Sequence, residues 1–233
     1  KANMSQSEKY SRLSLEYFEQ VNDKRGMVNA LSTLTYLARQ NKDFDSAREL
    51  INKSIETARS INDTIPLADA LNTLGNIYKD MLLFNSAIDS YFEALKLWEL
   101  KNDSAGIAIA YGSIGLMYFY QKDYTRALEF NFKKLPISQE TGNLWEVSKT
   151  LNNISQIYNA RSQFDSSLYF LKKGLALNEM MNIPSGVINV CNNLASTMLQ
   201  VGEVDSAYYY IKQAVDIARR VNDASLANCL VTM

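Results

Sequence analysis

Apolar residues recur along this chain at the three- and four-residue spacing of amphipathic helices. One stripe in the first half of the chain has members at i, i+3, i+6 and i+7, namely Leu71, Leu74, Ile77 and Tyr78. A short polar break follows, and the same spacing resumes between Phe84 and Trp98. The pattern therefore predicts two consecutive helices, each with one apolar face and one polar face.

The same arrangement returns every forty residues. A column of mostly large residues, each forty positions after the last, reads Phe44, Phe84, Tyr124, Phe164 and Val204. A column of small residues reads Ala47, Ala87, Ala127, Ser167 and Ala207. The period holds over five copies without an insertion. It predicts an array of helix pairs in which neighbouring copies bury each other's apolar faces.

Polar dipeptides such as Asn62-Asp63 and Asn102-Asp103 mark the boundaries of the copies. Asn tolerates the left-handed conformation that ends a helix, and Asp caps the helix that follows. We expect one array over residues 1–233, made of a partial repeat at 1–22, full repeats at 23–62, 63–102, 103–142, 143–182 and 183–222, and a truncated repeat at 223–233. Neither end shows a polar capping face and the chain does not begin with Met, so we expect it to be a piece of a longer protein.

These columns resemble the tetratricopeptide repeat (TPR). The family pattern has an apolar residue, then Leu, a small residue and Tyr on the first helix, followed by a small and a large residue on the second. The second copy supplies Leu71, Leu74, Gly75, Tyr78, Ala87 and Tyr91 in this order. The likeness covers essentially the whole chain, although forty residues exceed the usual repeat length of about 34. It implies an all-α fold, a right-handed superhelix of antiparallel helix pairs.

In TPR arrays the first helix of each pair lines a concave face, so the resemblance implies a ligand groove. The candidate groove residues are Tyr36, Arg39, Asn72, Asn76, Lys79, Ile109, Leu116, Phe119, Tyr120, Asn152, Gln156, Asn189 and Asn192. Amide side chains offer donors and acceptors without charge, which suits hydrogen bonding to the main chain of an extended peptide. The apolar members on the third repeat would take an anchoring side chain. Two alternatives remain open: the amides are a solvated helix face, and the apolar patch packs between repeats.

Composition narrows the classes of function. Histidine is absent and cysteine occurs twice, which removes His-based triads, HExxH zinc sites and four-thiolate zinc sites. The sequence contains no glycine-rich phosphate loop, and no pair of carboxylates lies in a catalytic motif. We therefore predict a protein that is not an enzyme, with no catalytic residue, no metal and no cofactor.

The charge balance and hydropathy bear on the partner. Lys and Arg number 24 against 25 Asp and Glu, for a formal net charge of −1, which argues against direct nucleic-acid binding. No apolar run approaches the roughly 18 residues that cross a bilayer, so we expect no membrane insertion by this segment. The expected partner is a protein or extended peptide, and homo-oligomerisation stays open, as does a cytoplasmic or periplasmic location.

With its forty-residue period, the repeat pattern of this chain resembles the TPR segments of peptide-binding adaptors, quorum-sensing regulators and bacterial sensor-regulators. The resemblance implies a non-catalytic protein- or peptide-binding scaffold, the sensor or interaction segment of a larger bacterial regulatory protein. The alternative is a structural or self-associating (dimerising) helical array without a groove ligand.

The second helix of the third repeat departs from the pattern. Asn131 stands where the other repeats have a large residue, and Lys134 where they have a small one. Pro136 lies well inside the same helix, where proline costs about 3 kcal/mol if nothing relieves it. We predict a kink that changes the curvature of the array, with a locally absorbed bend as the alternative.

Overall fold

The computed structural model describes residues 2–221, with side chains from residue 6 onward, and over this range its regular elements are α-helices. They are α1 (Ala2–Gln20), α2 (Lys24–Gln40), α3 (Phe44–Ser60), α4 (Thr64–Asp80), α5 (Phe84–Leu100), α6 (Ser104–Tyr120), α7 (Tyr124–Glu140), α8 (Leu144–Ala160), α9 (Phe164–Met180), α10 (Pro184–Gln200) and α11 (Val204–Val221). The predicted all-α fold of repeated helix pairs is confirmed. The truncated repeat predicted at 223–233 lies outside the described residues.

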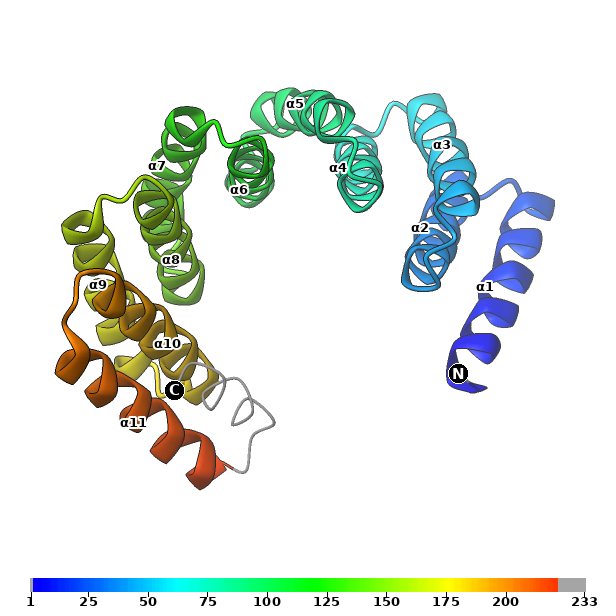
Figure 1. Cartoon of the computed structure of the whole chain (residues 1–233). Helices are drawn as coiled ribbons and strands as arrows, with labels where there is room; N and C mark the ends of the chain where they lie inside the picture. Colours follow the sequence, from blue (N-terminus) through cyan, green and yellow to red (C-terminus); the bar gives the residue numbers. More distant parts are fainter. Residues whose placement is uncertain (1, 222–233) are drawn as a thin grey trace. The chain divides into compact units, whose positions relative to one another are not determined.

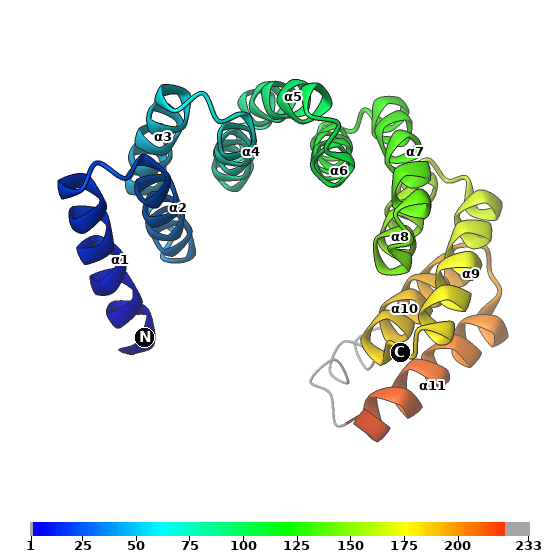
Figure 2. The same ribbon diagram turned by 180° about the vertical axis from the view of Figure 1, so that it is seen from behind.

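The chain divides into two compact units, unit 1 over residues 1–121 and unit 2 over residues 122–233. Within each unit, consecutive helices pack against one another. We call α2, α4, α6, α8 and α10 the first helices of their repeats, and α3, α5, α7, α9 and α11 the second helices. In unit 1 the first helices lie along one side and α3 and α5 along the other, as Figures 1 and 2 show from opposite directions.

The helices are joined by short turns that share one backbone conformation. A positive φ recurs every twenty residues, at Asn22, Lys42, Asn62, Leu82, Asn102, Lys122, Gly142, Ser162, Asn182 and Gly202. The next N–H then folds back onto the helix end; that of Leu83, for example, donates to the carbonyl of Tyr78 at 2.8 Å. Helices end at the boundary dipeptides, and Asp23 and Asp103 cap the helices that follow, whereas Asp63 makes no side-chain capping hydrogen bond. Four of the turns inside the repeats adopt the same conformation at residue types that do not favour it, namely Lys42, Leu82, Lys122 and Ser162, and the fifth has Gly202.

Glycines make room for large side chains where one repeat meets the next. A Cβ added to Gly106 on α6 would come within 2.3 Å of the Trp98 ring on α5. Eighty residues earlier, a Cβ on Gly26 would come equally close to the ring of Phe18. Because protein interiors are close-packed, these glycines are the space into which the rings fit.

The repeats between them carry the opposite combination. The equivalent pairs of positions hold Ala58 with Pro66, and Ser138 with Glu146. A small residue on the second helix is thus matched by a larger one on the following first helix. Size complementarity therefore alternates with a period of eighty residues, twice the period of the helix pattern.

Helix α7 runs from Tyr124 to Glu140 without interruption and contains Pro136. Proline leaves the carbonyl four residues earlier, that of Phe132, without its helical partner. Both Pro136 and Phe132 are exposed, so this carbonyl lies on a side of the helix that water reaches. Pro136 does not end the helix, and the predicted change of curvature stays a prediction.

Replacing Gly106 by Ala is expected to lower the free energy of unfolding by about 1–3 kcal/mol, because the new methyl group overlaps the buried Trp98 ring. Gly174→Ala is the matched control. Its Cβ would lie 3.8 Å from the nearest atoms, and alanine favours a helix by about 0.5–1 kcal/mol over glycine. Urea unfolding followed by circular dichroism measures both variants. Equal stabilities would contradict the packing assigned to Gly106.

Replacing Leu82 by Asn is expected to raise the free energy of unfolding by about 0.5–1 kcal/mol, since Asn tolerates the left-handed conformation better than Leu. Leu82 has a φ of 61° and is 72% exposed, so little burial is lost. Leu100→Asn is the control, because Leu100 is 71% exposed without a positive φ. A shift in the urea midpoint for Leu82→Asn alone is the expected result; similar midpoints would refute it.

Candidate functional site

The candidate groove residues all lie on first helices, and they divide between the two units. Those of unit 1 come from α2, α4 and α6, and those of unit 2 come from α8 and α10. Each set is therefore described within its own unit. A single groove over the whole chain stays a prediction.

Two basic candidates of unit 1 share one carboxylate. Arg39 Nε on α2 lies 2.6 Å from Asp80 Oδ2 on α4, and Lys79 Nζ lies 3.6 Å from Asp80 Oδ1. All three side chains are about one-quarter exposed, at 24%, 26% and 27% for Arg39, Lys79 and Asp80. The ion pair joins consecutive first helices, and one positive charge stays in excess at this place.

Asn76 is held by the interior of its own repeat. Its Oδ1 accepts a hydrogen bond of 3.0 Å from the hydroxyl of Tyr91, a fully buried side chain on α5. Burial and the Asp80 carboxylate raise the pKa of Tyr91, and Arg39 offsets only part of this rise. Because the oxygen of Asn76 faces inward, its amide nitrogen is the end left for other contacts.

The apolar candidates on α6 form a partly exposed patch. Ile109 is 51% and Tyr120 50% exposed, whereas Leu116 and Phe119 are half-buried. The ring of Tyr120 stacks on Phe84 of α5, with ring centroids 5.5 Å apart. Within unit 1, Ile109 and Tyr120 thus offer apolar surface to solvent. Tyr36 on α2 is exposed as well.

Two candidate asparagines have a buried side-chain oxygen that accepts no hydrogen bond from the described residues. Asn72 on α4 and Asn192 on α10 are half-buried, and the side-chain oxygen of each has no hydrogen-bond partner among the described residues. A buried polar atom left unpaired costs about 1–3 kcal/mol. Such atoms are rare in native proteins and call for an explanation.

The amides of unit 2 also link first helices. Asn152 Oδ1 on α8 accepts from Asn193 Nδ2 on α10 at 2.7 Å. A second bridge of 2.7 Å runs from Asn159 Nδ2 to Thr197 Oγ1. The sequence pattern singled out Asn152 for ligand contact and did not include Asn193. Gln156 and Asn189 are exposed, as a ligand-binding role requires.

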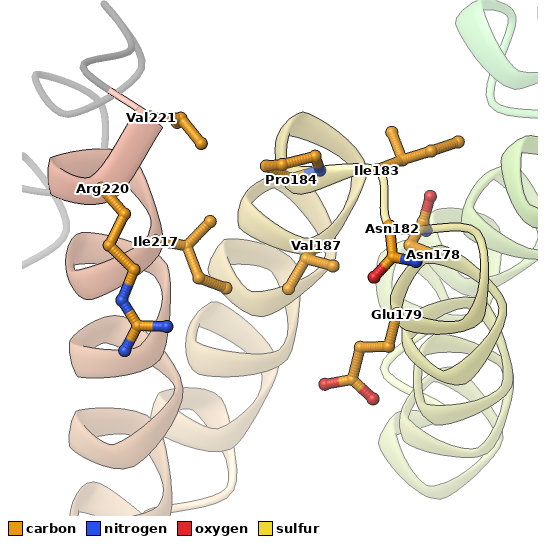
Figure 3. A pocket seen from close by; sticks show the side chains of 9 residues that line it. All are labelled: Asn178, Glu179, Asn182, Ile183, Pro184, Val187, Ile217, Arg220 and Val221. Carbon is orange, nitrogen blue, oxygen red and sulfur yellow. The ribbon is translucent and has the colours of Figure 1, made fainter.

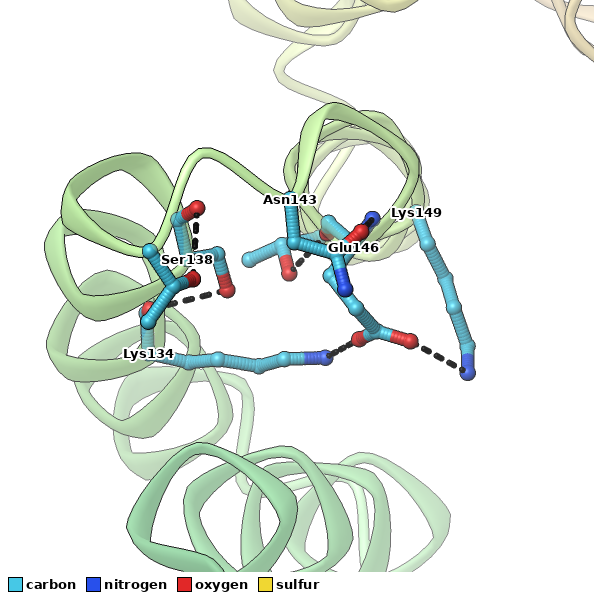
Figure 4. A network of polar contacts seen from close by, with 7 residues as sticks. Lys134, Ser138, Asn143, Glu146 and Lys149 are labelled. Atoms are coloured by element: carbon cyan, nitrogen blue, oxygen red, sulfur yellow. Dashed lines mark hydrogen bonds and ion pairs between the residues drawn. The ribbon is translucent and has the colours of Figure 1, made fainter. Parts of the chain in front are cut away.

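An ion-pair network joins α7 and α8 in unit 2 (Figure 4). Lys134, buried on α7, places its Nζ 2.5 Å from Glu146 Oε2, and Lys149 Nζ lies 3.5 Å from Glu146 Oε1. Burial acts to raise the pKa of Glu146, but its hydrogen bonds and charge interactions with the two lysines outweigh burial and lower it. Glu146 therefore stays ionised at neutral pH and holds both ammonium groups.

A small pocket opens between α8, α9 and α10, with a volume of about 120 Å³. Its lining residues are Trp145, Ser148, Lys149, Asn152, Asn178, Gly186, Asn189 and Val190. We call it the α8–α10 pocket. It brings together two candidate groove residues, Asn152 and Asn189, with Trp145 and Lys149, which are both exposed.

A larger pocket of about 380 Å³ lies among the ends of α9, α10 and α11 (Figure 3). Its lining residues are Asn178, Glu179, Asn182, Ile183, Pro184, Val187, Ile217, Arg220 and Val221. None of them is a candidate groove residue, and no sequence pattern singled this place out.

Within residues 2–221, the helices are too short or too polar to cross a membrane. Among the described side chains, no group of three or more His, Cys, Asp or Glu residues is placed to hold a metal ion.

Glu146→Gln is expected to lower the free energy of unfolding by about 3 kcal/mol at neutral pH, because it leaves Lys134 buried without a counter-charge. The pKa of Glu146 is lowered below 4.5 in the folded state. Its stabilisation is therefore fully present above pH 4.5 and disappears as the pH falls through the lowered value. Urea unfolding between pH 3 and 7 checks this, and Lys149→Met, at the exposed end of the network, is the control. A pH-independent difference would contradict the assignment.

The sequence matches no protein-family model, and no curated protein is similar to it. Solved structures do share its fold. BtubC (BKLC) from P. vanneervenii is similar over 95% of this chain and 90% of that chain, with a TM-score of 0.81 and 19% identity.

In two further solved structures, the part that is similar to this chain is a smaller share of the whole protein. A signal transduction ATPase with numerous domains (STAND) that has a tetratricopeptide repeat sensor, from Pyrococcus horikoshii, matches 100% of this chain with a TM-score of 0.80 and 20% identity, but this chain spans only 36% of it. A Rap protein complexed with competence and sporulation factor matches 95% of this chain and 66% of that chain, with a TM-score of 0.70 and 14% identity. The regular helix pairs and these likenesses agree with the sequence columns: the chain has the fold of TPR-like helix pairs, repeated every forty residues.

Proposed function

We propose that this chain is a non-catalytic scaffold that binds a protein or extended peptide on the faces of its first helices. The observation that carries the proposal is the recurrence of amides at one position of these helices, at Asn72, Asn152 and Asn192. All three side chains are half-buried, so part of each stays accessible to a ligand. A peptide main chain supplies donors and acceptors at regular intervals, which neutral amides can pair with whatever the peptide's sequence.

The exposed apolar residues of α6 complement these amides. Ile109 and Tyr120 are each about half exposed and lie on a first helix of the same unit as Asn72. Aromatic and large aliphatic residues supply much of the affinity at protein interfaces. An anchoring side chain of the ligand would lie on this patch while amides hold its main chain.

The similar structures support a regulatory setting. One is a STAND protein with a TPR sensor, and another is a Rap protein complexed with competence and sporulation factor. We propose on this basis that the chain is the sensor or interaction segment of a larger bacterial regulatory protein. The proposal concerns binding; no catalytic group is assigned to either unit.

Selection of random peptides of about 15 residues against the whole chain tests the proposal. An extended peptide of this length spans about 50 Å at about 3.3 Å per residue. Asn72→Ala and Asn192→Ala should each weaken the selected peptides by about 5-fold, the equivalent of about 1 kcal/mol for a neutral hydrogen bond. Asn52→Ala, at an exposed position of the second helix α3, is the matched control and should leave affinity unchanged.

Failure to select any peptide, or equal affinities for all three variants, would refute the first-helix site. Sedimentation velocity at increasing protein concentration distinguishes the peptide-binding scaffold from the alternative, a self-associating array without a groove ligand. A mass that rises with concentration, together with no selected peptide, would favour the self-associating array.

A further inference from the structure

The turn between α4 and α5 exposes two consecutive leucines. Leu82 is 72% exposed and Leu83 is 45% exposed. The other four turns inside the repeats have a polar residue or glycine at each of these positions, namely Lys42 and Asp43, Lys122 and Asp123, Ser162 and Gln163, and Gly202 and Glu203. An apolar pair in contact with water at this one turn therefore departs from the repeat pattern.

Both leucines make the folded chain less stable than polar residues would. Leu82 has a φ of 61°, a left-handed conformation that Asn or Gly adopts at lower cost. Leu83 occupies the capping position of α5 and makes no side-chain hydrogen bond, whereas Asp43 accepts one of 3.2 Å from the backbone N–H of Ser46. Because neither leucine is buried in return, the two costs point to a contact outside this chain.

Two aromatic residues extend this apolar surface. Phe84, which follows Leu83 and is half-buried, stacks on Tyr120 of α6 with ring centroids 5.5 Å apart. A hydrogen bond of 2.7 Å from Gln121 Nε2 to Asn85 Oδ1 joins the same two helix ends. The aromatic part of the surface is thus fixed within unit 1 before any partner binds. We call the four residues together the leucine-turn patch: Leu82, Leu83, Phe84 and Tyr120.

The leucine-turn patch contains no charged residue. The sequence is uncharged over residues 81–88 and again over residues 104–121. The last two residues of α4, Lys79 and Asp80, have opposite signs and form an ion pair at 3.6 Å. In a contact with two-fold symmetry each patch faces a copy of itself, so a charge in it would oppose a like charge. A neutral patch avoids this repulsion and therefore suits a second copy of this chain.

The size of the leucine-turn patch points to a weak contact. An aromatic side chain buries about 150–250 Å² when it is fully enclosed, and the partly exposed side chains of the patch offer less than this. The four residues together supply on the order of 300 Å², below the roughly 800 Å² per partner of a standard interface. We therefore expect a dimer that forms only at high protein concentration, with a dissociation constant on the order of 0.1–1 mM.

We propose that two copies of this chain associate through the leucine-turn patch in a closed, two-fold dimer. Leu82 and Leu83 of each copy lie against the patch of the other copy, where they lose contact with water. The stacked rings of Phe84 and Tyr120 supply the rest of the apolar contact. This association goes beyond the peptide-binding proposal and does not depend on it.

Sedimentation equilibrium of the whole chain up to about 1 mM tests the association. The wild-type mass should rise from 26.4 kDa toward twice that value and no further, because an isologous contact is closed. Leu83→Asp and Leu83→Lys should each weaken the dimer by about 10-fold or more, since like charges then face one another. An equimolar mixture of these two variants should associate again, because opposite charges then meet across the contact.

Two further measurements separate this contact from general effects on the protein. Leu100→Lys is the matched control, because Leu100 is 71% exposed at the far end of α5, and its dimer should match the wild type. Leu83→Asp should also raise the thermal unfolding midpoint by capping α5, as Asp43 caps α3. A higher midpoint together with lost association is a combination that misfolding does not produce.

Four results would each overturn the proposal. The first is a wild-type mass that stays at that of the monomer, which would assign the leucine-turn patch to a partner other than a second copy. The second is growth beyond a dimer. The third is an equal loss of association in Leu83→Lys and Leu100→Lys, and the fourth is a mixture of Leu83→Asp and Leu83→Lys that fails to associate.

Discussion

The equal length of the helices is the constraint on which the rest of the structure depends. A left-handed residue every twenty positions ends each helix, so that α2 to α10 all have seventeen residues. Because helix length and turn repeat together, the same face of every first helix returns after forty residues. Packing between neighbours and the alignment of amides on the first helices both follow from this regularity. The turn is maintained even at Leu82 and Lys122, where the side chain disfavours it.

Where one repeat meets the next, a glycine on one helix makes room for a large aromatic side chain on the neighbouring helix. Phe18 and Trp98 pack on Gly26 and Gly106, while the equivalent positions of α7 and α8 hold Ser138 and Glu146. Glu146 forms an ion pair with the buried Lys134 of α7. The same Glu146 also holds Lys149 at the rim of the α8–α10 pocket. A departure from the repeat in α7 thus contributes to the electrostatics of a candidate binding site on α8.

Side chains at ligand-facing positions also serve the scaffold. Arg39 joins α2 to α4 through Asp80, Asn76 is held by Tyr91, and Asn152 joins α8 to α10 through Asn193. Within each unit, such links between neighbouring first helices add rigidity. A ligand that contacts Asn76 or Asn152 therefore meets an amide whose orientation is already set. The amide oxygen of Asn72, by contrast, has no hydrogen-bond partner among the described residues.

The sequence alone determined the helix pairs, their forty-residue period and the boundary turns at residues such as Asn62, because apolar spacing and left-handed preference are local properties. It also placed the candidate groove residues on the first helices. The tertiary structure decided that Arg39 pairs with Asp80, that Asn152 pairs with Asn193, and that Lys149, Asn152 and Gly186 line one pocket. These outcomes join residues up to 41 positions apart on different helices. Which side chains meet there depends on the rotation and spacing of packed helices, and no local pattern encodes those.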